Sequence, residues 1–268
     1  MIKKFLYTAI FISSFSSYCT QPTKKTPVCI DLTCFMETNA TSAASCVGYF
    51  DAIGYFTATG HIPGIDNLFE ALQDAPAQST LVTYNQNYQM PLILSDWLLG
   101  APNQLIKQNC FTCLEQNTTL KNIEKTVLKS IVDMMLTPKK LIETQSIISS
   151  TKKLIEDLYA TGMHDIYLVG NWDADSTQAL LAKISSLKMM HLFTGFIFSH
   201  DLKTLKPHAQ FYTKMLAAVG CTNPSECICL EREPVMQEEA QRLGFAYIPF
   251  SSKASVMKSH ASQLGIVI

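Results

Sequence analysis

From Asp165 onwards the chain alternates between strand-like and helix-like patterns. The strand-like runs are short and apolar, namely DIYLVGN (165–171), FTGFIFS (193–199), ECICL (226–230) and FAYIPF (245–250). Between them lie amphipathic, helix-like runs at residues 175–187, 206–220 and 234–244. Strands that alternate with helices are typical of a parallel sheet with helices on both faces. The sequence therefore predicts an α/β fold with a doubly wound parallel sheet.

An earlier run, VCID (28–31), reads as one more strand, buried on both faces and ending in a carboxylate, Asp31. After it, apolar residues recur at spacings of three and four, which indicates helices. These helical patterns occupy residues 67–75, 91–100, 122–136 and 146–162. We therefore expect residues 20–39 and 163–268 to form the sheet domain. Residues 40–162 are expected to form an inserted helical unit.

The N-terminus forms a separate segment. Lys3 and Lys4 precede a short apolar run that fades into serines, FLYTAIFISSFSS (5–17), which is the layout of a secretory signal peptide. The run is too short to span a bilayer comfortably. We predict that residues 1–19 are removed, and that the exported chain, periplasmic or secreted, has no membrane span. A cytoplasmic protein with a buried first helix is the alternative.

Composition excludes one class of partner and leaves other questions open. A formal net charge of -1 gives no electrostatic footprint for nucleic acid. Nine cysteines fit an exported chain without proving export. A local disulfide between Cys110 and Cys113, or between Cys221 and Cys227, is an open alternative. The oligomeric state is not predicted.

Polar residues follow the predicted strands at the edge where parallel α/β sheets bind ligands. These residues are Asp31, Gly170, Asn171, Ser199 with Lys206 close behind, and Glu231 to Glu233. Such a set fits a phosphoryl site, because a carboxylate can attack phosphorus while amides and a lysine hold the phosphoryl oxygens. Acidic side chains at the same edge can hold Mg²⁺. The partner predicted in this way is a small anionic or phosphorylated substrate.

Four stretches together resemble the motifs of the haloacid dehalogenase (HAD) superfamily of phosphatases and dehalogenases. VCIDLTCFMET (28–38) aligns with the first motif, a strand followed by DxDGTL, and YLVGNWDADS (167–176) resembles the second. GFIFSHDLKTLKPHAQFY (195–212) and CICLEREPVMQEEAQRLGF (227–245) are similar to the third and fourth. The resemblance implies a Rossmann-like core with a helical cap inserted after the first strand. It also implies a nucleophilic Asp31, a catalytic Lys206, and phosphate binding at Gly170 and Asn171.

The same comparison shows where this chain departs from the family pattern. Thr33 stands where most phosphatases of the family have a general acid-base aspartate, and its hydroxyl does not ionise near neutral pH. Gly170 replaces a serine or threonine. Glu231 and Arg232 replace two aspartates that hold magnesium, so Asp31 and Glu231 are the remaining candidate ligands. A guanidinium at this place disfavours Mg²⁺, and we expect Arg232 to pair with Asp31 or to bind an anion.

Two function classes therefore remain. The first is a HAD-like hydrolase with an aspartate nucleophile and phosphatase-type or dehalogenase-like chemistry, whose activity is weak or altered. In this class Mg²⁺ is a possible but doubtful cofactor. The second is a catalytically inactive HAD-like protein that binds an anionic ligand or a protein partner. The substrate is not predicted, because no motif marks the loops that would select it.

Overall fold

The computed structural model of the protein describes residues 25–39, 42–43, 65–85 and 88–268. The predicted signal segment, residues 1–19, lies outside the described residues, and its removal stays a prediction. None of the helices within the described ranges is long and apolar enough to cross a membrane.

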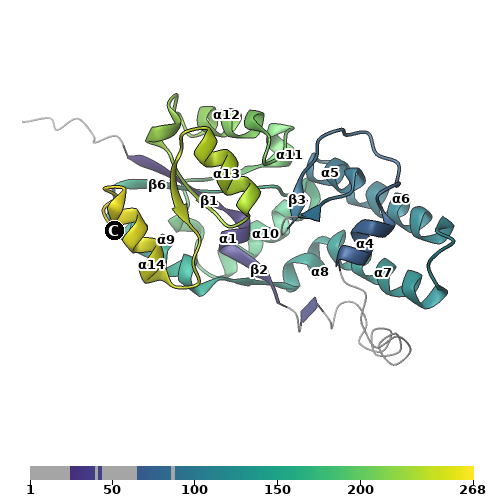
Figure 1. The fold of residues 1–268 in the computed structure, drawn as a ribbon. Coiled ribbons are helices and arrows are strands. Elements are labelled where there is room, and N and C mark those ends of the chain that lie inside the picture. Colours follow the sequence, from purple (N-terminus) through teal and green to yellow (C-terminus); the bar gives the residue numbers. More distant parts are fainter. Residues whose placement is uncertain (1–24, 40–41, 44–64, 86–87) are drawn as a thin grey trace, which may run out of the picture.

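A sheet of five parallel strands forms the core, as predicted (Figure 1). Its order is β7 (Gly195–Phe198), β6 (His164–Gly170), β1 (Thr26–Asp31), β8 (Ile228–Glu231) and β9 (Ala246–Pro249). The first strand of the chain lies at the centre and pairs with β6 on one side and with β8 on the other. All strands therefore present their carboxyl ends at one edge of the sheet.

Alternate residues of β1 pack into separate layers on the two faces of the sheet. Cys29 lies in the layer of α12 (Ala209–Ala218) and α13 (Pro234–Arg242). Val28 and Ile30 lie in the layer of α9 (Ser149–Ala160), α10 (Ala174–Ser186) and α14 (Ala254–Gln263). Side chains alternate between the faces of a strand, so a strand without polar residues is buried on both sides. This arrangement explains the continuous apolar run before Asp31.

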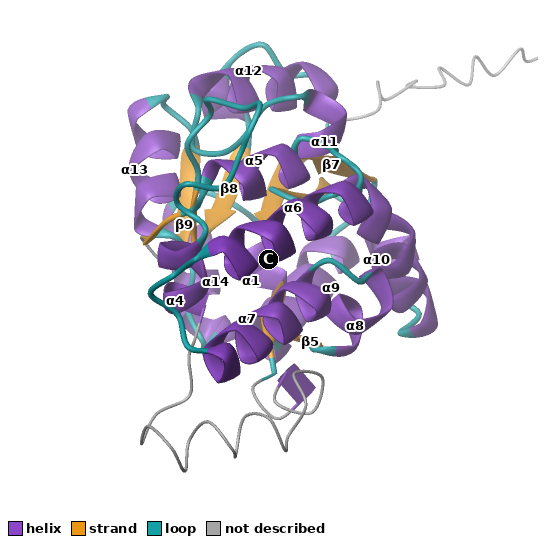
Figure 2. Ribbon diagram, turned by 90° about the vertical axis from the view of Figure 1, so that its right-hand side faces the viewer, coloured by secondary structure: helices purple, strands orange, loops and turns teal. Residues whose placement is uncertain are grey.

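The helices of the inserted region lie beyond the carboxyl edge of the sheet (Figures 1 and 2). They are α4 (Ile65–Ala71), α5 (Leu92–Leu98), α6 (Asn103–Gln116), α7 (Asn122–Met135) and α8 (Pro138–Glu143). A short hairpin precedes α5, formed by β3 (Tyr84–Asn85) and β4 (Tyr88–Gln89). The chain leaves the sheet through β2 (Met36–Thr38) and returns through β5 (Gln145–Ile147), which pair in antiparallel fashion.

The last helix predicted for the inserted unit packs with the sheet. Helix α9 contacts β6 and α14, whereas α8 and the helices before it lie on the other side of the β2–β5 pair. The predicted division at residues 39 and 163 remains a proposal. The contacts of α9 favour placing the second boundary near β5.

Several short elements complete the described chain. Helix α1 (Leu32–Phe35) follows β1 directly, and α11 (Ser199–Leu202) follows β7. Two single 3₁₀ turns, η1 (Met190–Leu192) and η2 (Pro224–Glu226), precede β7 and β8.

Some elements had no clear signal in the sequence. The sequence patterns did not predict α6 or α14. Pro138, which reads as a helix break, instead begins α8, where a missing amide hydrogen costs no helical hydrogen bond. Neither of the local disulfides that the sequence left open is present, since Cys110, Cys113 and Cys227 are free thiols.

Candidate functional site

Asp31 lies at the carboxyl end of the central strand, and both of its carboxylate oxygens accept hydrogen bonds. It also caps the N-terminus of α1, so the backbone amide of Thr33 donates to Oδ1 at 2.8 Å. The Thr33 hydroxyl donates to the same oxygen at 2.5 Å. Asp31 Oδ2 lies 2.7 Å from Lys206 Nζ. The side chain is thus fixed in one orientation at the sheet edge, where its exposed fraction is only 4%.

Lys206 forms a buried trio with Asp31 and Glu231. Its Nζ lies 2.6 Å from Glu231 Oε1 as well as 2.7 Å from Asp31 Oδ2, and the lysine is fully buried. The rings of Phe211 and Tyr212 lie beside the ammonium, with centroids 5.5 and 5.7 Å away. The sequence prediction placed these three charged residues at one edge, and the structure brings them into direct contact.

The trio contains one cation for two carboxylates, and the pKa values of its members reflect this imbalance. Burial alone would lower the pKa of Lys206, but Asp31 and Glu231 outweigh it and hold that pKa well above its usual value. Burial raises the pKa of Glu231 to about 8, and Lys206 opposes this shift only in part. With a pKa of about 8, Glu231 is largely protonated near neutral pH, where it contacts the Lys206 ammonium as a neutral carboxyl group.

Asn171 positions Lys206 through its backbone. The Asn171 side chain accepts from the Lys206 amide at 2.9 Å, and its Nδ2 donates to the Lys206 carbonyl at 3.1 Å. Thr83, which precedes β3 in the inserted region, donates to the same carbonyl at 2.7 Å. The Asn171 side chain therefore holds the lysine in place, and the predicted phosphate contact through the Asn171 backbone amide stays a prediction.

Gly170 allows the end of β6 to approach Asp31 closely. A Cβ atom at this position would lie 3.1 Å from Leu32 Cβ and 3.4 Å from Asp31 Oδ2. The first distance is tighter than ordinary packing contacts, so a side chain here would crowd α1 and the carboxylate. The glycine that replaces the expected serine or threonine thus fits the local geometry.

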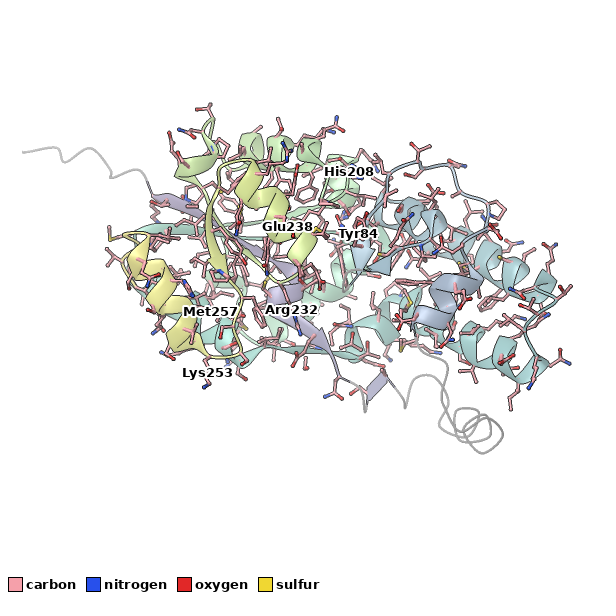
Figure 3. The ribbon with its side chains drawn as sticks, in the orientation of Figure 1. Tyr84, His208, Arg232, Glu238, Lys253 and Met257 are labelled. Atoms are coloured by element: carbon pink, nitrogen blue, oxygen red, sulfur yellow. The ribbon has the colours of Figure 1, made fainter. Side chains whose placement is uncertain are left out.

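Arg232 lies on the segment that joins β8 to α13 (Figure 3). Its Nη1 donates to the Thr33 carbonyl at 3.3 Å and lies 3.7 Å from Glu37 Oε2. Its guanidinium packs over the ring of Phe250, 5.0 Å from the centroid. These contacts do not include the expected pairing with Asp31, and they give no support to the predicted anion-binding role.

The residues predicted to hold Mg²⁺ contact basic side chains in this structure. The Lys206 ammonium already bridges Asp31 and Glu231, the two predicted ligands. The guanidinium of Arg232 donates a hydrogen bond to the nearby carbonyl of Thr33. Magnesium takes octahedral oxygen ligands, and at this site the ammonium already contacts one oxygen of each predicted carboxylate ligand. Among the described residues no cluster of three His, Cys, Asp or Glu side chains is arranged for a metal.

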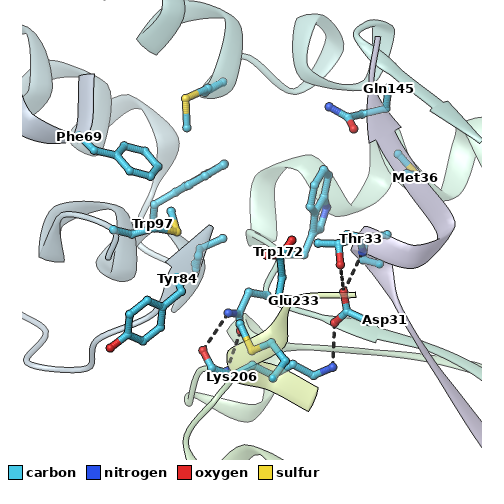
Figure 4. Close-up of a pocket in the computed structure, with 16 residues that line it drawn as sticks. Asp31, Thr33, Met36, Phe69, Tyr84, Trp97, Gln145, Trp172, Lys206 and Glu233 are labelled. Carbon is cyan, nitrogen blue, oxygen red and sulfur yellow. Dashed lines mark hydrogen bonds and ion pairs between the residues drawn. The ribbon is translucent and has the colours of Figure 1, made fainter. Parts of the chain in front are cut away.

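A cavity of about 210 Å³ opens beside the trio, between the sheet edge and the inserted helices (Figure 4). Asp31, Thr33, Asn171 and Lys206 line its polar end, together with Glu233. The other lining residues are mostly large and apolar, among them Met36, Phe69, Met90, Trp97, Met135, Trp172 and Met236. The geometry therefore offers a carboxylate held by Lys206 at the end of an apolar pocket.

The sequence did not single out the residues that shape this pocket. Trp97, Phe69 and Met135 lie on helices whose apolar spacing is the same as that of ordinary core residues. Glu233, only 8% exposed, was predicted to lie at the ligand-binding edge of the sheet, but without an individual role. Its position two residues after a strand end was the available signal for a pocket residue.

Neither protein-family models nor curated proteins match this sequence. Solved structures do match its fold. A predicted HAD-like family hydrolase from Porphyromonas gingivalis is similar with a TM-score of 0.55 and 14% identity, over 90% of this chain and 98% of that one. A HAD family enzyme from Bacteroides thetaiotaomicron has a TM-score of 0.51 and 11% identity, over 84% and 93% of the two chains.

The chain has a HAD-like fold. The Bacteroides enzyme was also solved in complex with magnesium and inorganic phosphate, and that structure matches with a TM-score of 0.50 and 10% identity over the same shares of the two chains. At these identities the HAD-like likeness concerns the fold, so the chemistry of this chain has to be argued from its own residues.

Proposed function

We propose that this HAD-like protein is a hydrolase that acts through Asp31 at an electrophilic carbon, without a resident divalent cation. The observation that carries the proposal is the orientation of Asp31. Its carboxylate lines the pocket and is held there by the buried Lys206, which also balances its charge. Fixed orientation next to a substrate site is what a carboxylate nucleophile requires.

The charge of the site favours carbon over phosphorus. A phosphoryl dianion needs cations to balance its oxygens. Among the described residues that line the pocket, Lys206 is the basic one, and two carboxylates already share it. Displacement at carbon needs fewer nearby cations, because only the leaving group gains negative charge. The phosphatase-type reaction is therefore the less favoured form of the hydrolase.

The proposed reaction has two steps. The Asp31 carboxylate forms a bond to the substrate carbon as the bond to the leaving group breaks, which gives an ester and a free anion. Water then attacks the ester carbonyl, so the alcohol product and the Asp31 carboxylate are released together with one proton. Glu233 is the candidate base for that water, because it is the other carboxylate among the described residues that line the pocket.

The proposal is tested by turnover of chloroacetate, benzyl chloride and p-nitrophenyl phosphate in the presence of EDTA. We expect release of chloride from at least one organochloride, and its loss in Asp31→Asn, which retains the shape of the side chain. Mass spectrometry of the peptide that carries Asp31 is expected to detect the ester when the second step is slow. Turnover that survives Asp31→Asn, or that requires Mg²⁺, would contradict the proposal.

A second candidate function is ligand binding without catalysis. The observation in its favour is that Thr33 places two donors on Asp31 Oδ1, at 2.5 and 2.8 Å. Hydrogen bonds to a carboxylate stabilise its charge and weaken it as a nucleophile. Absence of turnover with all three probes, in a protein that still binds ligands in the pocket, would favour this function.

We also propose that the protein is exported. The support is the sequence pattern of residues 1–19, a basic start followed by a short apolar run. N-terminal sequencing of the protein recovered from its native host tests the proposal. A mature chain that begins near residue 20 is the expected result, and a cytosolic chain that retains Met1 would contradict it.

A further inference from the structure

The pocket has two chemically different ends (Figure 4). Asp31, Thr33 and Glu233 lie at the end formed by the sheet. Phe69 and Trp97 lie at the opposite end, on helices of the inserted region. Four methionines also line the pocket, namely Met36, Met90, Met135 and Met236. Methionine is flexible and polarisable, and it adapts to apolar groups of varied shape.

The aromatic end offers carbon rather than polar atoms to a ligand. The indole nitrogen of Trp97 donates to Asn103 Oδ1 at 2.9 Å, so its polar atom is already in use. Asn103 is itself buried and donates to the Leu136 carbonyl at 3.2 Å. The hydroxyl of Tyr84 points away from Asp31 in Figure 4. A ligand at this end therefore meets ring faces and thioethers, whereas a sugar or polyol would leave its hydroxyl groups without partners.

Trp172 is fixed in the pocket wall by its backbone. The Trp172 amide donates a hydrogen bond to Ser199 Oγ at 3.0 Å, and the Trp172 carbonyl lies 2.9 Å from His200 Nδ1. These two contacts fix the position of its backbone. The side chain is 8% exposed and lines the cavity. An apolar wall that is already held in place orders a ligand without a large entropic cost to the protein.

The size of the cavity limits the apolar group. A dry cavity of about 150 Å³ lined by apolar side chains is large enough to bind benzene. The cavity here, about 210 Å³, therefore has room for one ring and a small reactive group next to it. We propose that the substrate carries an apolar group about the size of a benzene ring, attached to the carbon that faces Asp31. This inference deepens the proposed function and rests on it for the position of the reactive carbon.

Binding of product-like alcohols tests the inference without catalysis. The chain has two tryptophans, and both line this cavity, so tryptophan emission reports directly on its contents. Titrations with benzyl alcohol, ethanol and glycerol give three dissociation constants. We expect benzyl alcohol to bind at least tenfold more tightly than either of the small alcohols, because only its ring fills the apolar end.

Polar replacements in the lining, with a matched surface control, locate the binding site. Met135→Gln retains side-chain length but adds an amide to the apolar lining, and Met90→Gln makes the same change at a second lining residue. Each variant is expected to bind benzyl alcohol severalfold more weakly than the native protein and to bind ethanol with unchanged affinity. Met163→Gln, at a side chain that is 51% exposed, is expected to bind like the native protein. Far-UV circular dichroism confirms that each variant is folded.

The outcomes separate this inference from the proposed function. Equal affinity for benzyl alcohol, ethanol and glycerol would overturn the inference, as would no emission change up to the solubility limit of benzyl alcohol. An affinity for benzyl alcohol that is the same in Met135→Gln, in Met90→Gln and in the native protein would also overturn the inference. Saturable binding of benzyl alcohol in a protein without turnover would leave the inference standing and remove the hydrolase. Turnover of chloroacetate alone, without binding of benzyl alcohol, would do the reverse.

Discussion

Lys206 and Glu231 form an ion pair of 2.6 Å in which each side chain is only 1% exposed. Asp31 pairs with the same ammonium at 2.7 Å, so removal of the lysine would take the cation out of this buried cluster. Breaking a buried ion pair by removing one partner typically costs about 3–5 kcal/mol.

We therefore expect Lys206→Met to lower the free energy of unfolding by several kcal/mol, measured by urea denaturation. Lys139→Met is the matched control, since the Lys139 side chain is 86% exposed and its pairing with Glu143 spans 4.0 Å. The control should change stability by less than about 1 kcal/mol. Equal stability of the two variants would show that the buried trio contributes little.

The raised pKa of Glu231 predicts a pH dependence of stability. Burial raises this pKa to about 8 in the folded chain, above its ordinary value of 4.5. Between these values the folded state binds more protons than the unfolded state, so stability falls as pH rises from about 4.5 to about 8. Glu231→Gln, which cannot ionise, is expected to flatten this part of the profile.

Thermal unfolding of both proteins between these pH values measures the effect. The two profiles should differ most at their alkaline end, where Glu231 is ionised and competes with Asp31 for one ammonium. Parallel profiles for native protein and Glu231→Gln would mean that another group causes the pH dependence.

Asn171 predicts a separation between stability and catalysis. Asn171→Ala removes the side chain that binds both the amide and the carbonyl of Lys206. We expect a loss of about 1–3 kcal/mol in unfolding free energy. Where turnover is measurable, kcat should fall more than KM changes, because the lysine loses its fixed position relative to Asp31. Asn109→Ala, on α6, is the control, and a comparable loss of kcat there would refute the positioning role.

Magnesium-dependent hydrolysis of p-nitrophenyl phosphate is expected to be absent or very slow in the native protein. The reasons are the ammonium between Asp31 and Glu231, the guanidinium at the Thr33 carbonyl, and the missing carboxylate at position 33. The double replacement Thr33→Asp with Arg232→Asp removes two of these obstacles. We expect it to raise the Mg²⁺-dependent rate, and we expect Asp31→Asn to abolish the gain. Robust native turnover with Mg²⁺ would show that the metal displaces Lys206.

The sheet and its edge were predictable from the sequence because the signals are local. The run before Asp31 is apolar at every position, which a strand buried on both faces requires, and the polar residues begin where β1 ends. Parallel strands bring their carboxyl ends together, so the sequence also predicted that Asp31, Lys206 and Glu231 would lie at one edge. The alternation of strands and helices determined the rest of the doubly wound order.

The pocket wall and the direction of Arg232 depend on contacts between distant segments. Phe69 and Trp97 have the spacing of core residues, and only the docking of the inserted helices places them at a cavity. Arg232 follows a strand end as predicted, but β2 brings Glu37 to its other side and the guanidinium turns there. Glu37 is placed by the pairing of β2 with β5, which joins residues 36–38 to residues 145–147. No local sequence pattern predicts this pairing.

The hydrogen bond from Thr83 to the Lys206 carbonyl limits the modularity of this architecture. Thr83 belongs to the inserted region, whereas Lys206 belongs to the sheet domain and contacts Asp31. If the inserted unit were exchanged for one from another protein, the Lys206 carbonyl would lose the hydrogen bond that Thr83 donates. An exchanged inserted region would therefore have to supply a new donor to this carbonyl, so the inserted region cannot diverge independently of the part of the chain that holds Asp31.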